Sequence, residues 1–258
     1  MGFSLDWLAL REAADGDARD DRLRRGAAQL AGDNPVVMDL GCGSGSTARA
    51  LSEVLPENTQ WRLVDNDPVL LDTARRSVGA DSSTHQLDID DVASLPQQGA
   101  TLVTASALLD LVTESWLERF ISIVDVPFYA ALTYNGTMRW DPPLPEDALI
   151  TDAFNRHQRS DKGLGPALGP QAVTTAHRVF RAAGRDVTIA DSPWELGPES
   201  HALQEALVEG IAAAAREMGE TAATAWGKAR VAAAPDTHCT VGHEDILVSA
   251  PRLKGNNP

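Results

Sequence analysis

The sequence predicts an α/β protein with a doubly wound, mostly parallel sheet of seven strands and with helical insertions. Three observations lead to this prediction. Apolar stretches of strand length alternate with amphipathic helical patterns, as they do in β-α-β units. The first predicted strand runs into a glycine-rich turn, and the 258 residues are enough for one such domain with insertions. The strands are expected at residues 36–40, 61–65, 85–90, 101–106, 126–134, 186–190 and 244–248.

The glycine-rich turn carries the strongest local signal. An apolar, β-branched run that contains Asp39 is followed by Gly41, Gly43 and Gly45, and then by a helical pattern over about 44–55. These features predict a buried strand, a tight turn and a helix N-terminus. Glycine allows a left-handed backbone and a close approach of a ligand. The free N–H groups at the helix start favour a ligand with negative charge or lone pairs.

Two classes of protein use such a turn. Dinucleotide enzymes have the pattern G-x-G-x-x-G, in which the third glycine packs the helix on the strand. Counted from Gly41, that position is Ser46. The pattern D-x-G-x-G-x-G found here instead resembles motif I of class I S-adenosylmethionine (SAM)-dependent methyltransferases, with their Rossmann-like fold. The resemblance implies that the loop from Gly41 to Gly45, including Cys42, packs against the amino-acid and ribose parts of SAM, and that Asp39 reaches the methionine amino group, often through water.

The end of the second predicted strand supplies the next candidate contacts with the cofactor. Asp65 suits a vicinal diol, because one carboxylate can accept hydrogen bonds from both ribose hydroxyls. Asn66 directly follows it and is included in the predicted site. The alternative role for Asp65 is a cap for the next helix, but Asp67 before Pro68 fits that role better.

The third and fourth predicted strands extend the site. The resemblance implies that Asp88 meets the exocyclic amine of adenine and that Ile89 lies beside the ring, although Asp90 and Asp91 compete for the first role. Ser106 is expected in the crevice because parallel sheets bind ligands at the carboxyl ends of their strands.

The domain organisation follows from these patterns. Residues 1–34 are predicted to form two helices. The resemblance implies that these helices lie over the cofactor site, where Arg11 or Arg19 either meets the SAM carboxylate or is a surface arginine. The methyltransferase domain is expected over 35–251, with a flexible tail at 252–258.

Two insertions interrupt the predicted domain. Residues 135–171 are rich in Pro and Gly, hold a helix at 146–159 and follow the fifth strand, so they are expected to form a lid over the acceptor. Residues 197–235 hold two amphipathic helices. These helices are predicted to be a second wall of the acceptor pocket, a homodimer surface, or a cover for the sheet edge.

His157 and Asp110 are the candidate catalytic residues. His157 continues the apolar stripe of the helix at 146–159, and Asp110 follows the fourth strand at the crevice. Either side chain can contact the acceptor or act as its base. A lone histidine on an apolar face is more often a buried structural residue, and this alternative stays open for His157.

Composition restricts the partners. The net charge of −15 disfavours nucleic acid, which would be repelled. The tetrapeptide Asn/Asp-Pro-Pro-Tyr/Phe/Trp of DNA and protein amino-group methyltransferases is absent after the fourth strand. No apolar run reaches the roughly 20 residues of a membrane span. No signal peptide, disulfide framework or metal site is evident, so a cytoplasmic location is expected.

The resemblance implies SAM-dependent methyl transfer by in-line displacement, and the charge and the missing tetrapeptide favour a small-molecule acceptor. Two alternatives remain at the level of sequence. One is a nicotinamide-dependent oxidoreductase, which Ser46 and the acid before the glycine turn disfavour. The other is a non-catalytic module that binds SAM, because no motif fixes the catalytic residues in this class.

Overall fold

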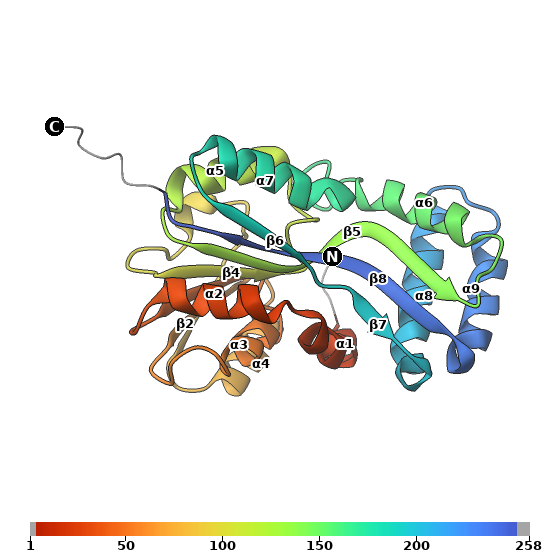
Figure 1. The fold of residues 1–258 in the computed structure, drawn as a ribbon, viewed down its shortest axis with the longest axis horizontal. Coiled ribbons are helices and arrows are strands. Elements are labelled where there is room, and N and C mark those ends of the chain that lie inside the picture. Colours follow the sequence, from red (N-terminus) through yellow and green to blue (C-terminus); the bar gives the residue numbers. More distant parts are fainter. Residues whose placement is uncertain (1–3, 252–258) are drawn as a thin grey trace.

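A twisted sheet forms the centre of the molecule in the computed structural model, which describes residues 4–251 (Figure 1). Within this range the sheet has eight strands in the order β3-β2-β1-β4-β5-β8-β6, and β7 pairs with β8 outside this path. The strands are β1 Val36–Leu40, β2 Gln60–Asp65, β3 Ser82–Gln86, β4 Leu102–Ser106, β5 Phe128–Asp141, β6 Val187–Asp191, β7 Trp194–Leu196 and β8 His238–Val248. The predicted fold class is confirmed, with β7 as an additional short strand. The predicted tail at 252–258 lies outside the described residues.

Helices cover both faces of the sheet (Figure 1). The α-helices in the described range are α1 Leu5–Ala18, α2 Asp21–Ala31, α3 Ser46–Leu51, α4 Pro68–Val78, α5 Glu114–Ile123, α6 Asp147–Gln158, α7 Ala172–Ala182, α8 His201–Glu217 and α9 Ala223–Ala233. Helices α2, α3 and α4 pack on one face of the parallel strands, and α5 and α7 pack on the other. None of the helices within residues 4–251 has the length and apolar character that a membrane span requires.

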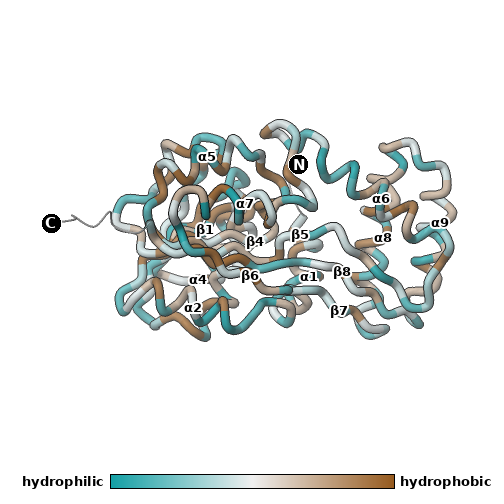
Figure 2. The backbone as a smooth tube through the Cα atoms, turned by 45° about the horizontal axis from the view of Figure 1, so that its top comes forward, coloured by the Kyte–Doolittle hydropathy of each residue, from teal (hydrophilic) through white to brown (hydrophobic). Residues whose placement is uncertain are grey.

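The parallel strands are apolar because both of their faces are buried. In β1, Val37 packs in the core under α2 and α3, whereas Met38 and Leu40 pack in the core under α5 and α7. This alternation follows from the two-residue period of a strand. In Figure 2, which colours the backbone by the hydropathy of each residue, hydrophobic residues gather in the central strands of the sheet.

A long antiparallel pair, β5 with β8, extends the sheet beyond its parallel part. The pairing runs from Phe128 opposite Val248 to Asp141 opposite His238, with register shifts between Ala130/Thr133 and Tyr134/Met138. The extension carries a separate apolar cluster with α6, α8 and α9. The prediction that a lid begins at residue 135 was therefore wrong, because 135–141 continue strand β5. The predicted last strand was also too short, because β8 begins at His238.

Two further elements differ from the predicted ranges. The third strand was predicted at 85–90, but β3 spans Ser82–Gln86, and Asp88 lies in the turn after it. This strand is at the sheet edge and is partly solvated, so its Ser and Thr residues lack an apolar alternation. The helix predicted at 44–55 begins only at Ser46, because Gly45 adopts a left-handed conformation as its N-cap, and it ends at Leu51.

Helices α8 and α9 do not cover the outer strand β6. They pack on each other, on α6 and on the β5–β8 extension. This arrangement places the insertion against the β5–β8 extension, next to helix α6 in the segment that follows β5.

Candidate functional site

A cavity of about 300 Å³ opens at the carboxyl ends of β1, β2 and β4. Helix α1 contributes Leu8, Arg11 and Asp15 to its wall, and the segment after α6 contributes Lys162, Gly163 and Leu164. The predicted cofactor residues that line it are Gly41, Cys42, Gly43, Asp65, Asn66, Asp88, Ile89 and Ser106. Asp39 and Gly45 lie outside this lining.

The glycine turn is held to the end of β2 by Asp65. One carboxylate oxygen of Asp65 accepts a hydrogen bond from the Gly43 N–H at 2.9 Å, and the other accepts one from the Asp67 N–H at 3.0 Å. Gly43 has a φ of +52°, which favours glycine at this close approach. The Asp65 carboxylate is therefore fixed in the cavity wall with lone pairs left for a ligand.

Asp67 performs the capping role that was the alternative for Asp65. Its side chain accepts from the backbone N–H groups of Val69 at 2.8 Å and Leu70 at 3.4 Å, and Pro68 occupies the first turn of α4. This separation of roles frees Asp65 to face the cavity.

Gly45 has a packing role. Its φ is +88°, and a Cβ at this position would lie 3.1 to 3.3 Å from atoms of Ser77, Val78 and Ala74 in α4. Helix α4 can therefore approach the start of α3 only because residue 45 has no side chain.

Two unsatisfied polar groups lie behind the cavity. Asp39 is completely buried, and the Thr104 hydroxyl donates to its Oδ1 at 2.7 Å, whereas Oδ2 has no partner in residues 4–251. Arg19 is buried and donates from Nη2 to the Ser106 hydroxyl oxygen at 2.8 Å, but Nε and Nη1 lack partners within the described chain. Thr47 also donates to Ser106, at 3.0 Å. Burial raises the pKa of Asp39 to about 7, an effect that the Thr104 hydrogen bond and the Arg19 charge oppose.

We expect Asp39→Asn to stabilise the ligand-free protein by about 2 to 4 kcal/mol at pH 8 and to weaken its affinity for SAM. The raised folded-state pKa means that the folded protein retains a proton which the unfolded chain, with an Asp pKa of about 3.9, has lost. Wild-type stability from this group is therefore highest below pH 4 and falls as the pH rises to 7. Urea denaturation at pH 4, 6 and 8 measures the difference between the two proteins, which should disappear at pH 4. A gain that is independent of pH would contradict the assignment.

Arg11 forms an ion pair with Asp15 in the part of the cavity wall that α1 contributes. Its Nε and Nη2 donate to the two Asp15 oxygens at 2.8 and 3.0 Å. The indole N–H of Trp194 also donates to Asp15, at 3.0 Å, and the Arg11 guanidinium lies 5.0 Å from the Trp194 ring centroid. His243 lies 5.1 Å from the same indole ring. These contacts join α1 to β7 and β8.

Asp110, a predicted catalytic residue, is 6% exposed and does not line the cavity, although Leu108 and Leu111, close to it in sequence, do. Its Oδ1 has no hydrogen-bond partner among the residues described. Burial raises the pKa of Asp110 to about 6, while the nearby charges of Arg11 and Lys162 act to lower it. A carboxyl group with this pKa is mostly ionised at neutral pH and can accept a proton.

His157, the other predicted catalytic residue, lies behind Lys162 and does not line the cavity. Its Nδ1 is 3.1 Å from Lys162 Nζ, and its Nε2 is 3.0 Å from a carboxylate oxygen of Glu217 in α8. The turn beside it is fixed by Asp161, which accepts from the N–H groups of Gly163 at 2.7 Å and Gly165 at 3.0 Å.

Several wall residues were not predicted from the sequence. The ion pair of Asp15 could have been predicted, because Asp15 stands four residues after Arg11 on the same helix face. Lys162 is part of an irregular turn and had no such signal. Others are Leu8, Thr47, Asp67, Leu70 and Leu87.

The strand order, the acid before a glycine turn and the acid that ends β2 are features of the class I, Rossmann-like fold of SAM-dependent methyltransferases. Residues 37–125, from β1 to the end of α5, match the family model described as a methyltransferase domain. None of the proteins with curated descriptions matches the chain.

Solved structures share this fold at low sequence identity. A candidate type II methyltransferase from Anaeromyxobacter dehalogenans has a TM-score of 0.54 and 17% identity, with 91% of this chain and 98% of that chain covered. A chain from the complex of the Haloferax volcanii Trm112 methyltransferase activator with a candidate methyltransferase has a TM-score of 0.52 and 19% identity, covering 96% and 94%. A geranyl diphosphate methyltransferase in complex with SAM has a TM-score of 0.50 and 11% identity, covering 90% and 84%.

Proposed function

We propose that the protein transfers the methyl group of SAM to a small-molecule acceptor bound between the cavity and the segment after α6. The observation that carries this proposal is the cradle at the carboxyl ends of β1 and β2. There, the fixed Asp65 carboxylate faces the cavity, with the buried Asp39 and Arg19 groups behind it. These groups match the ribose, amino and carboxylate parts of SAM.

The residues present fit SAM at its amino-acid end. We assign the carboxylate of SAM to Arg19 rather than to Arg11, because Arg11 is paired with Asp15 through two hydrogen bonds. Two Arg19 nitrogens have no partner in the part of the chain that is described. Asp39 Oδ2 would accept from the amino group, through water if the cavity wall separates them.

The adenine end is assigned to Asp88 and Ile89. Both line the cavity, whereas Asp90 forms an ion pair with Arg119 of α5. Asp91 does not line the cavity. This difference favours Asp88 over the two acids that compete with it in the sequence.

SAM, when bound, supplies a methyl group that its sulfonium already activates for displacement. The protein must then orient the acceptor and take its proton where the nucleophile is neutral. We assign to Asp110 the role of accepting the proton of the nucleophile. Its carboxylate is mostly ionised near neutral pH, and one of its oxygens has no hydrogen-bond partner within residues 4–251. His157 can act on the acceptor only through Lys162 in this arrangement.

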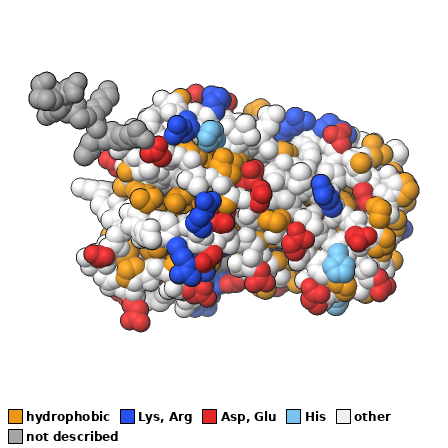
Figure 3. Space-filling model, viewed as in Figure 1, with side chains coloured by type: hydrophobic (Ala, Val, Ile, Leu, Met, Phe, Trp, Pro, Cys, Tyr) orange, Lys and Arg blue, Asp and Glu red, His pale blue; other side chains and the backbone are white. Residues whose placement is uncertain are grey.

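A small acceptor is favoured over nucleic acid by charge. Acidic and basic side chains are interspersed on the face shown in Figure 3, which has no broad basic area, and the chain carries a net charge of −15. Proteins that bind nucleic acid contact its phosphate backbone through broad basic areas.

The cofactor assignment is tested by calorimetric titration of wild type and Asp65→Ala with SAM, S-adenosylhomocysteine and NAD(H). Wild type should bind the first two ligands and not NAD(H). Asp65→Ala should lose about 100-fold in affinity, because it removes both the ribose contact and the anchor of Gly43. The matched control is Asp72→Ala, whose carboxylate pairs with Arg76 on the exposed side of α4.

Two results would contradict the proposal: binding of NAD(H) alone, or equal affinities in wild type and Asp65→Ala. Transfer from methyl-labelled SAM into a cell extract then tests the activity itself. Label in the low-mass fraction supports a small-molecule acceptor, and label in protein or nucleic acid refutes it. SAM binding without transfer to any fraction would favour the non-catalytic module.

A further inference from the structure

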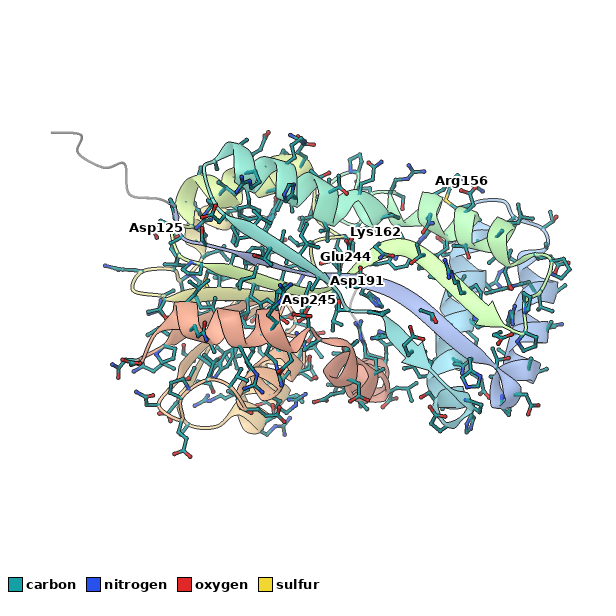
Figure 4. The ribbon with its side chains drawn as sticks, in the orientation of Figure 1. Asp125, Arg156, Lys162, Asp191, Glu244 and Asp245 are labelled. Carbon is teal, nitrogen blue, oxygen red and sulfur yellow. The ribbon has the colours of Figure 1, made fainter. Side chains whose placement is uncertain are left out.

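Lys162 is a cation in the cavity wall without a carboxylate partner. Its Nζ forms no ion pair within 4.0 Å in residues 4–251, whereas the other cation of the wall, Arg11, is neutralised by Asp15. Figure 4 shows Lys162 on the sheet side of the helical layer, while Arg156 points outward from α6. The lysine is thus directed toward the ligand space rather than toward bulk solvent.

A hydrogen-bonded chain orients this ammonium group. Because an ammonium group only donates, His157 Nδ1 accepts from Lys162 at 3.1 Å and the ring proton resides on Nε2. Nε2–H donates in turn to Glu217 at 3.0 Å. One of the three ammonium N–H groups is used in this way, and the other two remain for a ligand.

The position of Lys162 disfavours a free, solvated charge. Partial burial lowers the pKa of Lys162, against the attraction of Glu217 and Asp110. An anion bound at the ammonium group would compensate this desolvation. Asp110 itself is not bonded to the lysine, and its Oδ1 lacks a partner in the described structure.

We propose that Lys162 binds an anionic group of the methyl acceptor, either a carboxylate or a phosphate, and that His157 and Glu217 are positioning residues for this lysine. The inference rests on the proposed function, because it names the class of acceptor for the same site. The acceptor thus presents an anion to Lys162 and its nucleophile toward Asp110. We do not assign Lys162 to the SAM carboxylate, because Arg19 already offers two nitrogens without partners in residues 4–251, next to Ser106.

The test uses acetate and inorganic phosphate as probes of the full-length protein saturated with S-adenosylhomocysteine. Titrations followed by NMR of the backbone amides of residues 161–165 compare wild type, Lys162→Met and Lys228→Met. Lys228 is an exposed lysine on α9 and serves as the matched control. Wild type and Lys228→Met should bind one of the anions saturably, and Lys162→Met should bind it at least tenfold more weakly. Ethylammonium chloride should cause no saturable shift.

The two anions distinguish the sources of charge, since a carboxylate acceptor predicts stronger binding of acetate and a phosphorylated acceptor stronger binding of phosphate. Equal binding by wild type and Lys162→Met, or no saturable binding to wild type, overturns the proposal. A tenfold loss of SAM affinity in Lys162→Met also overturns it, because the lysine would then belong to the cofactor site. Failure of wild type to bind SAM is a separate result that overturns the proposed function, and the anion titration is repeated without S-adenosylhomocysteine to keep the two apart.

The positioning role has its own readout. His157→Phe should weaken binding of the preferred anion about fivefold, and His157→Asn should restore it, because the Asn oxygen can accept from Lys162 where Nδ1 did. Equal anion affinity in all three proteins would remove His157 from the proposal.

Discussion

Asp110→Asn is expected to lower kcat/KM for methyl transfer by about 10²- to 10⁴-fold, the usual range for loss of a general base. The substitution keeps the shape of the side chain and removes its capacity to take a proton. Asp110 is buried outside the cavity lining, and within residues 4–251 no hydrogen bond joins it to the glycine turn, so the affinity for SAM should change by less than about twofold.

The pH profile gives the more specific test of Asp110. Burial raises the pKa of its carboxyl to about 6, so the base is protonated and inactive below this value. Wild-type kcat/KM should fall tenfold per pH unit as the pH decreases below 6, and Asp110→Asn should lack this acidic limb. Asp39, with a pKa of about 7, is the other carboxyl that titrates near this range. Its effect is separated by following SAM affinity, which depends on Asp39 and not on Asp110.

The control for Asp110→Asn is Asp91→Asn, at an exposed position outside the cavity lining. A kcat/KM for Asp110→Asn within threefold of wild type, or an unchanged acidic limb, would show that the acceptor needs no base from this residue.

The parallel half of the fold was predictable because its chemistry is local. A buried parallel strand needs a continuous apolar run, as in β1 and β4, and the turn after β1 needs glycine at positive φ. Asp65 and Ser106 were predictable for a related reason, since carboxyl ends of parallel strands meet at one edge. Both residues line the cavity.

The β5–β8 extension and the segment after α6 were less predictable because they are built from contacts between distant parts of the chain. In strand β8 the buried Cys239 and Val241 alternate with His238 and Thr240, but Gly242 and His243 interrupt the apolar pattern before the predicted strand begins. Residues 238–243 form a strand because β5 and β7 pair with them on either side. Gly242 lies opposite the register shift of β5 between Tyr134 and Met138, where a Cβ would collide with the side chains of Thr137 and Asn135.

Single residues in these parts of the chain follow the same logic. Lys162 is brought to the cavity by a turn that Asp161 stabilises, and its partner chain comes from α6 and α8. No spacing in the sequence links His157 with Glu217, sixty positions away. The histidine was recognisable as a candidate, but its direction toward a lysine was not.

The helical insertion should depend strongly on a buried ion pair between α9 and α6. Arg230, whose side chain is 1% exposed, pairs with Asp147, and its Nη1 donates to the Pro142 carbonyl at 2.9 Å. The indole N–H of Trp226 donates to the same Asp147 carboxylate at 2.8 Å. Arg230 also lies 5.2 Å from the ring centroid of Trp140 in β5.

We expect Arg230→Ala to reduce the free energy of unfolding by about 3 to 5 kcal/mol, because it leaves the Asp147 charge largely buried without its partner. Urea denaturation monitored by tryptophan fluorescence measures the change, with Arg216→Ala on the exposed side of α8 as the control. The double variant Arg230→Met/Asp147→Leu should recover most of the loss, since replacing both members of a buried pair with apolar residues is often close to neutral. SAM affinity should be retained in all these proteins at low urea, because the glycine turn and Asp65 belong to the other end of the sheet. A loss below 1 kcal/mol for Arg230→Ala would show that the β5–β8 extension is held by its apolar cluster and not by this ion pair.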